Sequence, residues 1–336
     1  SGTGGFYSAW SPDGTRVSTW RETEGAVTVW DAASGEIMFA LSHSVPGKRA
    51  YAFFTGGWSP DGSRIVTTGQ DLTARVWDAW TGEEQLVLEG HEITVFSGDF
   101  SPDGLRILTG SFDGTARVWD ANTGELQFTL AAHDSWPRPL WSPSGDRILT
   151  TSDGLTVVWD ADTGEQLHFL RGRSGATTAY WSPDGTMISA GGAGGELKVW
   201  DSTSGDDVLS IKAHPGDYRM RWFPDSERIA TAGDEGNAKV WKVHTNRLSA
   251  RCQSDCPAIG LTGWYSVPSW SPDGQQVART YPGGLVIVWD VDSGQEAFRL
   301  DAEVVNDSGF IGGVLTLQWS PDGSHILTVD GDGYIN

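Results

Sequence analysis

A four-residue turn motif recurs along the whole chain, and this repetition constrains the fold more than any other feature of the sequence. Ser-Pro-Asp-Gly begins at six positions: Ser11, Ser59, Ser101, Ser182, Ser271 and Ser320. Weaker copies begin at Ser142 and Phe223, and the four central steps, between positions 59, 101, 142, 182 and 223, are 42, 41, 40 and 41 residues. A period in this range indicates repeated supersecondary units that bury their apolar faces against one another.

A second mark, a Trp-Asp pair that follows a valine, occurs once in most repeats. Its copies begin at Trp30, Trp77, Trp119, Trp159, Trp200 and Trp289, and Trp241 is followed by Lys242 instead. Between the two marks, short runs of β-branched and apolar residues alternate with turns rich in Gly, Asp and Ser. This pattern predicts strands joined by hairpins.

The third repeat, from Glu89 to Leu130, shows how one period becomes four strands. We expect strands over 95–100, 106–109, 115–119 and 125–130. The first hairpin contains Ser101-Pro102-Asp103-Gly104, where proline fixes φ for a turn and glycine accepts left-handed geometry. Each repeat therefore predicts one small antiparallel sheet.

A four-stranded sheet of this size cannot bury both faces alone, and radial stacking around an axis covers them. The expected fold class is all-β, a β-propeller of four-stranded antiparallel blades in a single domain, 1–336. Eight repeats predict eight blades, the last one incomplete because the chain stops at Asn336. A seven-bladed ring plus a leftover hairpin, Val314 to Val329, is the alternative. The missing initial methionine and the incomplete last repeat suggest a fragment of a longer protein.

The charge, the hydropathy and the cysteine content of the chain indicate which partners and which cellular compartment to expect. The formal net charge is −21, so the chain lacks the excess of basic residues that general nucleic-acid binding requires. We expect no membrane insertion either, because no stretch of about 18 apolar residues is present. Only Cys252 and Cys256 could form a disulfide, and with no secretory leader visible a cytoplasmic location is expected.

No motif for a metal or a cofactor stands out. His91-Glu92 lacks the second histidine of a zinc-binding helix. Asp330-Gly331-Asp332-Gly333 has Tyr334 where a calcium loop needs a third oxygen ligand. We expect no cofactor, no metal ion and no catalytic residue.

The order Gly-His, Ser-Pro-Asp-Gly, Asp-Gly-Thr and Val-Trp-Asp resembles the WD-repeat propellers, and in its uniformity the bacterial WD-repeat arrays. In that family a His, a Thr or Ser, an Asp and a Trp from each blade form a structural hydrogen-bonded set. The resemblance implies three complete sets: His43, Thr67, Asp71 and Trp77; His91, Thr109, Asp113 and Trp119; and His133, Thr150, Asp153 and Trp159. The sixth repeat has His214, Thr231 and Trp241 with a shifted acid, Asp234 or Glu235, and the fifth and seventh lack both His and Asp.

The family also places the connections before the first strand and between the second and third strands on one rim. The longest insertions, Ser42 to Thr55, Arg251 to Gly263 and Asp301 to Gly312, fall there. Aromatic and arginine side chains favour interface hot spots. The candidate partner-binding residues are Trp20, Arg21, Arg49, Tyr51, Phe112, Trp136, Arg138, Arg171, Arg173, Trp264, Tyr265, Tyr281 and Phe310.

The expected function is a non-catalytic protein–protein interaction platform, a scaffold or signalling sensor that binds proteins or peptides or serves fused domains of the same chain. The alternative is a propeller enzyme or a propeller that binds a carbohydrate or another small ligand. His, Asp and Thr also compose hydrolase triads, but three copies in successive repeats indicate architecture rather than one nucleophile.

Overall fold

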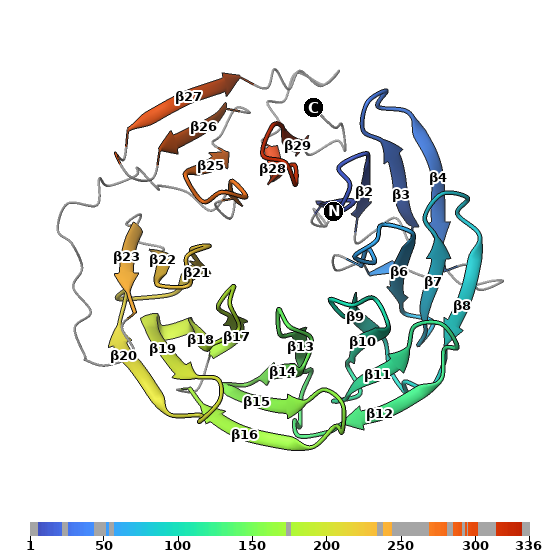
Figure 1. The fold of residues 1–336 in the computed structure, drawn as a ribbon, viewed down its shortest axis with the longest axis horizontal. Coiled ribbons are helices and arrows are strands. Elements are labelled where there is room, and N and C mark those ends of the chain that lie inside the picture. The colour runs from blue at the N-terminus through green and yellow to red at the C-terminus, as the bar shows by residue number, and fades with distance from the viewer. Residues whose placement is uncertain are drawn as a thin grey trace. The chain divides into compact units, whose positions relative to one another are not determined.

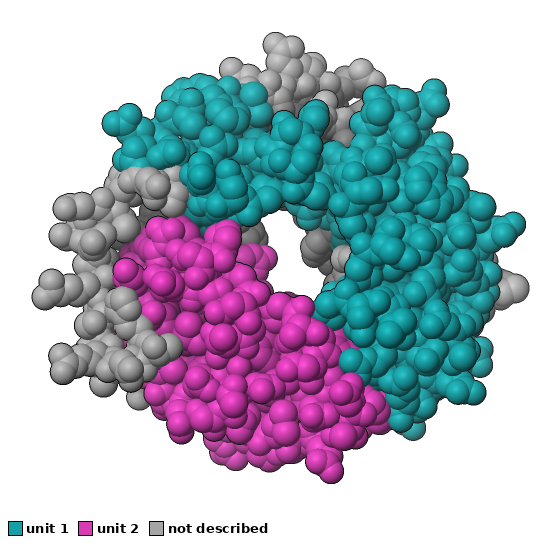
Figure 2. All heavy atoms as spheres, viewed as in Figure 1, with its two compact units in different colours: residues 1–113, 117–127, 265–336 teal, residues 114–116, 128–264 magenta. Residues whose placement is uncertain are grey.

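The computed structural model has strands in every repeat. It describes residues 6–21, 26–43, 52–53, 57–172, 176–233, 238–243, 269–280, 285–290, 293, 295–301 and 314–330. Within these residues the chain forms 29 β-strands and one short 3-10 helix, η1 (Ala193–Gly195), which confirms the all-β prediction. The chain divides into two compact units (Figure 2): residues 1–113, 117–127 and 265–336 form unit 1, and residues 114–116 and 128–264 form unit 2.

The strands of unit 1 form antiparallel sheets in which neighbours along the chain pair with each other (Figure 1). The first two sheets are β1 (Phe6–Trp10), β2 (Arg16–Arg21), β3 (Ala26–Asp31) and β4 (Ile37–Ser42), and β5 (Ala52–Phe53), β6 (Arg64–Gly69), β7 (Ala74–Asp78) and β8 (Glu84–Leu88). The next is β9 (Val95–Phe100), β10 (Arg106–Ser111), β11 (Ala116–Asp120) and β12 (Leu126–Leu130), of which a few residues belong to unit 2. Near the C-terminus come β24 (Ser269–Trp270), β25 (Gln276–Thr280), β26 (Leu285–Asp290) and β27 (Glu296–Asp301), then the hairpin β28 (Val314–Trp319) and β29 (Ile326–Asp330).

Unit 2 repeats the same plan three times. Its first sheet is β13 (Arg138–Trp141), β14 (Arg147–Ser152), β15 (Leu155–Asp160) and β16 (Gln166–Arg171). The second is β17 (Ala176–Trp181), β18 (Met187–Gly192), β19 (Glu196–Asp201) and β20 (Asp207–Lys212). The third has three strands in the described residues, β21 (Tyr218–Trp222), β22 (Arg228–Gly233) and β23 (Ala238–Lys242).

The Ser-Pro-Asp-Gly motif, or its weaker copy at Ser142 or Phe223, makes the first hairpin of each sheet. In the first copy the Ser11 amide donates to the carbonyl of Arg16 and the Gly14 amide to that of Ser11, both at 2.9 Å. Asp13 accepts the Thr15 amide at 3.0 Å, and Gly14 has φ +68°. Glycine adopts this left-handed conformation without steric cost, so the tetrapeptide fixes a tight turn wherever it occurs.

Apolar side chains from neighbouring sheets form the cores. Between the second and third sheets, Val66 and Val76 pack in one cluster with Phe100, Ile107 and Trp119. All five side chains are almost fully buried, and burying a side chain of this kind stabilises the fold by roughly 1.5–3 kcal/mol. The tryptophan of the Trp-Asp mark therefore fills space between sheets, as the sequence predicts.

Buried or half-buried arginines join adjacent sheets, which the sequence analysis did not anticipate. Arg16 is 1% exposed, and its guanidinium donates to the carbonyls of Ala79 at 2.5 Å and Gly62 at 2.8 Å in the next sheet. The same arrangement joins Arg64 to the carbonyls of Ala121 and Gly104, and Arg147 to that of Ser202. The signal was present, because an arginine follows the turn motif in five of eight repeats, at positions 16, 64, 106, 147 and 228.

The hairpin β28–β29 lies inside unit 1 rather than apart from it. The Gln318 side chain donates to the Ser8 carbonyl of β1 at 2.7 Å, and the Trp319 indole donates to the Ser269 carbonyl of β24 at 3.1 Å. Leu317 belongs to the same apolar cluster as Val286 and Val288 of β26. In the described residues there are seven sheets of three or four strands plus this hairpin, which fits the seven-plus-hairpin alternative. The hairpin packs between the last four-stranded sheet and the first.

Candidate functional site

The third repeat contains a continuous chain of buried hydrogen bonds between four side chains. The Trp119 indole donates to the Thr109 hydroxyl at 2.9 Å, which lies 2.8 Å from His91 Nε2. His91 Nδ1 lies 2.7 Å from an Asp113 carboxylate oxygen. Since that carboxylate can only accept, Nδ1 carries the proton and Thr109 donates to Nε2.

The second repeat has the same arrangement. His43 Nδ1 lies 2.9 Å from Asp71, and its Nε2 lies 2.8 Å from Thr67, which accepts the Trp77 indole at 2.7 Å. Burial alone raises the pKa of Asp71, but hydrogen bonds from His43 and other neighbours, with the charge of that histidine, hold this pKa well below its usual range. Asp71 is therefore a fixed anion in this sheet.

Burial also keeps two of these histidines neutral. It lowers the pKa of His91 below the ordinary 6.5, although Asp113 acts in the opposite direction. Burial likewise lowers the pKa of His133. A neutral imidazole with one donor and one acceptor nitrogen suits a position between a carboxylate and a hydroxyl.

The fourth repeat departs from the expected set at Asp153. His133 Nε2 lies 2.8 Å from the Thr150 hydroxyl, which accepts the Trp159 indole at 2.8 Å, but no hydrogen bond joins His133 to Asp153. The turn between β14 and β15 has only two residues, with φ +47° at Asp153 and +81° at Gly154. In the third repeat the corresponding connection, residues 112–115, has four. The shorter turn leaves Asp153 exposed at its tip.

The sixth repeat retains three members of the set. His214 Nε2 lies 2.8 Å from Thr231, which accepts the Trp241 indole at 2.8 Å. The Tyr218 ring stacks on His214 with the ring centroids 5.2 Å apart. The candidate acids Asp234 and Glu235 lie outside the described residues.

Trp20 was expected on the partner-binding rim, and this expectation is wrong. The side chain is 7% exposed and packs in a core cluster with Val27, Leu41 and Trp58. It lies on the regular strand β2 rather than in a connection. A tryptophan near a predicted strand end can therefore belong to the core, and the sequence alone did not separate the two cases.

Phe112 lies on the predicted rim together with two side chains that the sequence analysis missed. Phe112 is 37% exposed and Ile93 48% exposed. The Phe112 amide donates to the Thr94 carbonyl at 3.0 Å, and its ring lies 5.0 Å from the half-buried ring of Phe96. We call Ile93, Phe96 and Phe112 the rim cluster. The sequence signal for this cluster is an isoleucine two residues after the histidine of the Gly-His pair, Gly90-His91.

In unit 2, three candidates are exposed. Trp136, in the connection before β13, is 60% exposed, and Arg138 and Arg171 are exposed at a strand start and a strand end. Arg21 ends β2, and its side chain is outside the described part. Seven further candidates lie outside the described residues: Arg49, Tyr51, Arg173, Trp264, Tyr265, Tyr281 and Phe310.

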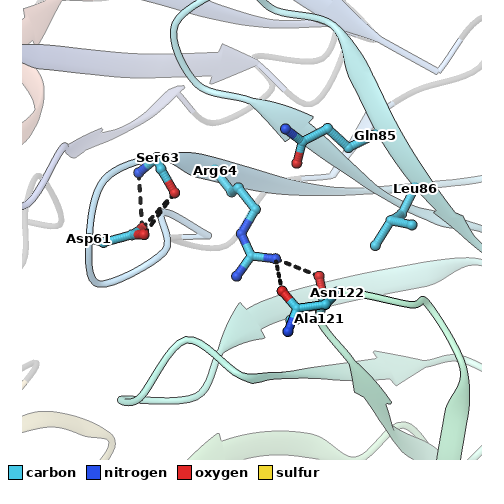
Figure 3. Close-up of a pocket in the computed structure, with 7 residues that line it drawn as sticks. All are labelled: Asp61, Ser63, Arg64, Gln85, Leu86, Ala121 and Asn122. Carbon is cyan, nitrogen blue, oxygen red and sulfur yellow. Dashed lines mark hydrogen bonds between the residues drawn. The ribbon is translucent and has the colours of Figure 1, made fainter.

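Unit 1 also has an open groove of about 490 Å³ between the second and third sheets, on the side of the Ser-Pro-Asp-Gly turns. Its lining residues are Asp61, Ser63, Arg64, Gln85, Leu86, Ala121 and Asn122 (Figure 3). Arg64 is hydrogen-bonded to the Ala121 and Gly104 carbonyls. Hydrogen bonds from Ser59 and Ser63 lower the pKa of Asp61 to about 2 despite its partial burial. Each charged group of the groove is thus hydrogen-bonded to neutral groups of the protein, and Arg64 joins the two sheets that form the groove.

Among the described residues, no group of three or more His, Cys, Asp or Glu side chains could hold a metal ion. The same residues include no helix long and apolar enough to cross a membrane. The donors and acceptors of the buried His–Thr–Trp sets are used in hydrogen bonds with one another.

Comparison with known proteins places this architecture in a family. WD repeat-containing protein 1 of Bos taurus and of Rattus norvegicus is in each case 32% identical over 63 residues, which is 19% of this chain and 10% of the relative. The match thus spans about a tenth of these relatives. The computationally designed Ika8 protein has the same fold, with a TM-score of 0.76 at 22% identity over 99% of this chain and 96% of that one. The model of the WD domain, G-beta repeat, matches residues 50–78, 82–120, 124–160, 164–201, 205–242 and 308–336. More than half of the chain is covered, and the chain belongs to the WD-repeat family of β-propellers.

Proposed function

We propose that this chain is a non-catalytic platform that binds other proteins through the rim cluster. WD-repeat propellers typically mediate protein–protein interaction. The observation that carries the proposal is the exposure of Phe112, whose ring packs against Phe96, and of Ile93 in the adjacent connection, where its carbonyl accepts the Ser111 hydroxyl at 3.0 Å. Exposed apolar side chains that adjoin one another mark an interaction surface more often than scattered ones do.

The charge near the rim cluster favours a partner with basic flanks. Glu89 and Glu92 are exposed in the connection before β9, and the whole chain carries a net charge of −21. Complementary charge steers association and selects among partners. The preferred ligand is therefore a peptide segment with one or two large apolar side chains beside lysine or arginine.

The buried sets support a non-catalytic role over the hydrolase alternative. The Thr109 side chain is 0% exposed, and its oxygen already accepts the Trp119 indole. A nucleophile must reach a substrate carbonyl and keep a lone pair for attack. Thr109 does not meet the first condition because its side chain is fully buried, and Thr150 and Thr231 are also buried and bonded in the same way.

The test uses substitutions taken from the protein's own repeats. Gln70 and Ser135 occupy the positions that correspond to Phe112 and Ile93, so Ile93→Ser with Phe112→Gln should fold normally. Wild type should enrich apolar–basic peptides from a displayed random 12-residue library, and the double variant should bind them at least about tenfold more weakly. A control variant, Leu126→Gln, changes an exposed leucine on β12 and should bind as wild type. Equal binding by the rim variant and wild type would refute the proposal.

A scaffold or sensor role within a larger regulatory protein, and a bacterial array type, remain parts of this proposal. They rest on the uniform repeat pattern of the sequence. A panel of hydrolase assays tests the enzymatic alternative. Turnover that is lost on changing one non-repeated residue would favour an enzyme over a non-catalytic platform.

A further inference from the structure

The first strand of the last sheet in unit 2, β21, has two arginines on its exposed face. Burial alternates strictly along this strand. Tyr218, Met220 and Trp222 are buried in a core cluster with side chains of the preceding sheet, and Arg219 and Arg221 are exposed between them. Successive side chains of a strand point to opposite faces, so the two arginines share the face that this core leaves uncovered.

The first strands of the other two sheets in unit 2, β13 and β17, continue this surface. Counted back from the turn motif, Arg138 corresponds to Arg219, and Leu140 and Tyr180 correspond to Arg221. Arg138 and Leu140 are exposed and Tyr180 is half-buried. Apolar clusters join the three sheets in sequence order, and β13, β17 and β21 are the edge strands at the same side of these sheets (Figure 1). We call these five residues the arginine face.

Tyr180 positions the guanidinium of Arg221. The tyrosine packs against the core cluster between the last two sheets, and the Arg221 guanidinium carbon lies 4.9 Å from the centroid of its ring. An arginine stacked on an aromatic ring presents the N–H groups at the edge of its plane, and this fork matches the two oxygens of a carboxylate. The stacking therefore orients Arg221 for bidentate binding of an anion.

Within the described part of unit 2, no carboxylate neutralises the arginines of this face. The ion pairs there involve other arginines and lysines. The cross-strand neighbours are small and uncharged: Thr151 opposite Arg138, Ala232 opposite Arg219 and Ala230 opposite Arg221. Asp217, which precedes β21, accepts the Gly194 amide at 2.9 Å. In a chain of net charge −21, the arginine face is thus a local excess of positive charge.

The blade plan itself does not require arginine at these positions. In the five repeats of unit 1 the residues that correspond to Arg221 are Ala9, Gly57, Asp99, Ser269 and Gln318. Those that correspond to Arg219 are Tyr7, Thr55, Ser97, Val267 and Thr316. Because the other repeats form their first strands without them, the three arginines need a reason beyond folding.

We propose that the arginine face binds an acidic peptide segment, whose glutamate or aspartate side chains pair with Arg138, Arg219 and Arg221 while an apolar side chain contacts Leu140. Charge complementarity identifies this ligand, since guanidinium–carboxylate pairs combine charge with two directed hydrogen bonds. A nucleic acid fits less well, because the acidic chain repels a long polyphosphate. This surface belongs to unit 2 and selects acidic segments, whereas the rim cluster belongs to unit 1 and favours basic ones.

Fluorescence anisotropy with a labelled peptide, Glu-Glu-Phe-Glu-Glu, tests the proposal on the full chain at low ionic strength. Wild type should bind this peptide at least about tenfold more tightly than its uncharged counterpart, Gln-Gln-Phe-Gln-Gln. Equal binding of the two peptides, or no binding of the acidic one, overturns the proposal. Tighter binding of an oligothymidine than of the acidic peptide also overturns it, because the ligand would then be a nucleic acid.

Substitutions taken from other repeats locate the site. Arg138→Ser, Arg219→Thr and Arg221→Gln together introduce the residues found at the corresponding positions 97, 316 and 318. This triple variant should bind the acidic peptide at least about tenfold more weakly, and circular dichroism melting shows that its fold is kept. Unchanged binding by the folded triple variant contradicts the proposal.

A matched control separates the site from the overall charge. Arg221→Gln and Arg171→Gln each remove one exposed arginine of unit 2, but Arg171 is at the end of the outer strand β16. Arg221→Gln should weaken binding by at least about threefold and Arg171→Gln by less than about twofold. Equal losses would show that only the net charge matters and would refute the site. The rim variant, Ile93→Ser with Phe112→Gln, should bind the acidic peptide as wild type does, so the two proposals fail separately.

A charge-conserving change tests the stacked geometry. Arg221→Lys keeps the positive charge but loses the planar fork. It should bind the acidic peptide at least about threefold more weakly than wild type. Binding equal to that of wild type contradicts bidentate pairing by the guanidinium that Tyr180 positions.

Discussion

Replacing Asp113 and Asp153 by asparagine should affect stability very differently, although both belong to the same sequence motif. Asp113 lies 2.7 Å from His91 Nδ1 and accepts the Glu92 amide at 3.0 Å. Asp153 is exposed and has no hydrogen bond to His133. Asparagine keeps the shape of the side chain and tolerates the left-handed φ of Asp153, so the comparison isolates the charge and its contacts.

The magnitude follows from the contacts. Hydrogen bonds to a charged group contribute about 1.5–3 kcal/mol and neutral ones about 0.5–1.5 kcal/mol. Asp113→Asn converts the first kind into the second, so the expected loss is about 1–2 kcal/mol in the free energy of unfolding. Asp153→Asn should stay within about 0.5 kcal/mol, the range of ordinary surface changes.

Urea unfolding followed by tryptophan fluorescence measures both variants, with coincident circular dichroism transitions as the check on cooperativity. The midpoint should shift for Asp113→Asn at unchanged slope. Equal losses in the two variants, or a larger loss for Asp153→Asn, would refute the argument that turn length decides which aspartate supports its histidine.

Three further predictions follow from buried or strained positions. Arg64→Met introduces the residue that stands at the corresponding position 187 of the fifth repeat. It should lower the free energy of unfolding by about 1–3 kcal/mol, because the Ala121 and Gly104 carbonyls lose their hydrogen-bond donor. An unchanged urea midpoint would contradict this. Leu72 has φ +72°, and the corresponding residue of the next repeat is Gly114. Leu72→Gly should therefore relieve about 1 kcal/mol of backbone strain and raise the thermal midpoint of unfolding. A lower midpoint argues against strain at this residue. Burial lowers the pKa of His91 from the ordinary 6.5, so the unfolded chain binds a proton that the folded chain excludes, and stability should fall as pH drops below about 6.5. Urea midpoints at pH 7.5 and 5.5 should differ less in His91→Asn than in wild type, and an equal difference would contradict the assignment.

Most of the fold could be predicted from two local patterns, the turn motif and the alternation of apolar residues along each strand. The expected strand over 95–100 coincides with β9, and the expected strands over 115–119 and 125–130 are within one residue of β11 and β12 at each end. The turn motif contains its own hydrogen bonds, so its structure depends little on the rest of the chain. Alternation of apolar residues fixes which strand positions can be buried.

The candidate site was predicted less completely, for reasons that lie beyond one repeat. Asp153 matched the motif, but a two-residue turn removed it from its histidine. The Ser-Asp-Gly-Leu sequence around it is typical of a tight hairpin, and this signal was available. Trp20 was placed on the rim, yet the neighbouring sheet covers it. Its burial depends on a packing partner in the next sheet, Trp58, which lies 38 residues further along the sequence.

The sequence by itself determined the spacing of the sheets, the position of each Ser-Pro-Asp-Gly turn and the resemblance to the WD-repeat family, because these features repeat within about 40 residues. It did not settle whether the last repeat makes a blade or a leftover hairpin, because that depends on contacts with the first sheet. Only the tertiary structure decided which side chains meet. It placed Arg16 under the next sheet, joined the hairpin β28–β29 to β1, and left Leu167 and Phe169 exposed on an edge. Burial and hydrogen bonding between sheets depend on which surfaces face each other, and a repeat pattern describes each surface without saying what covers it.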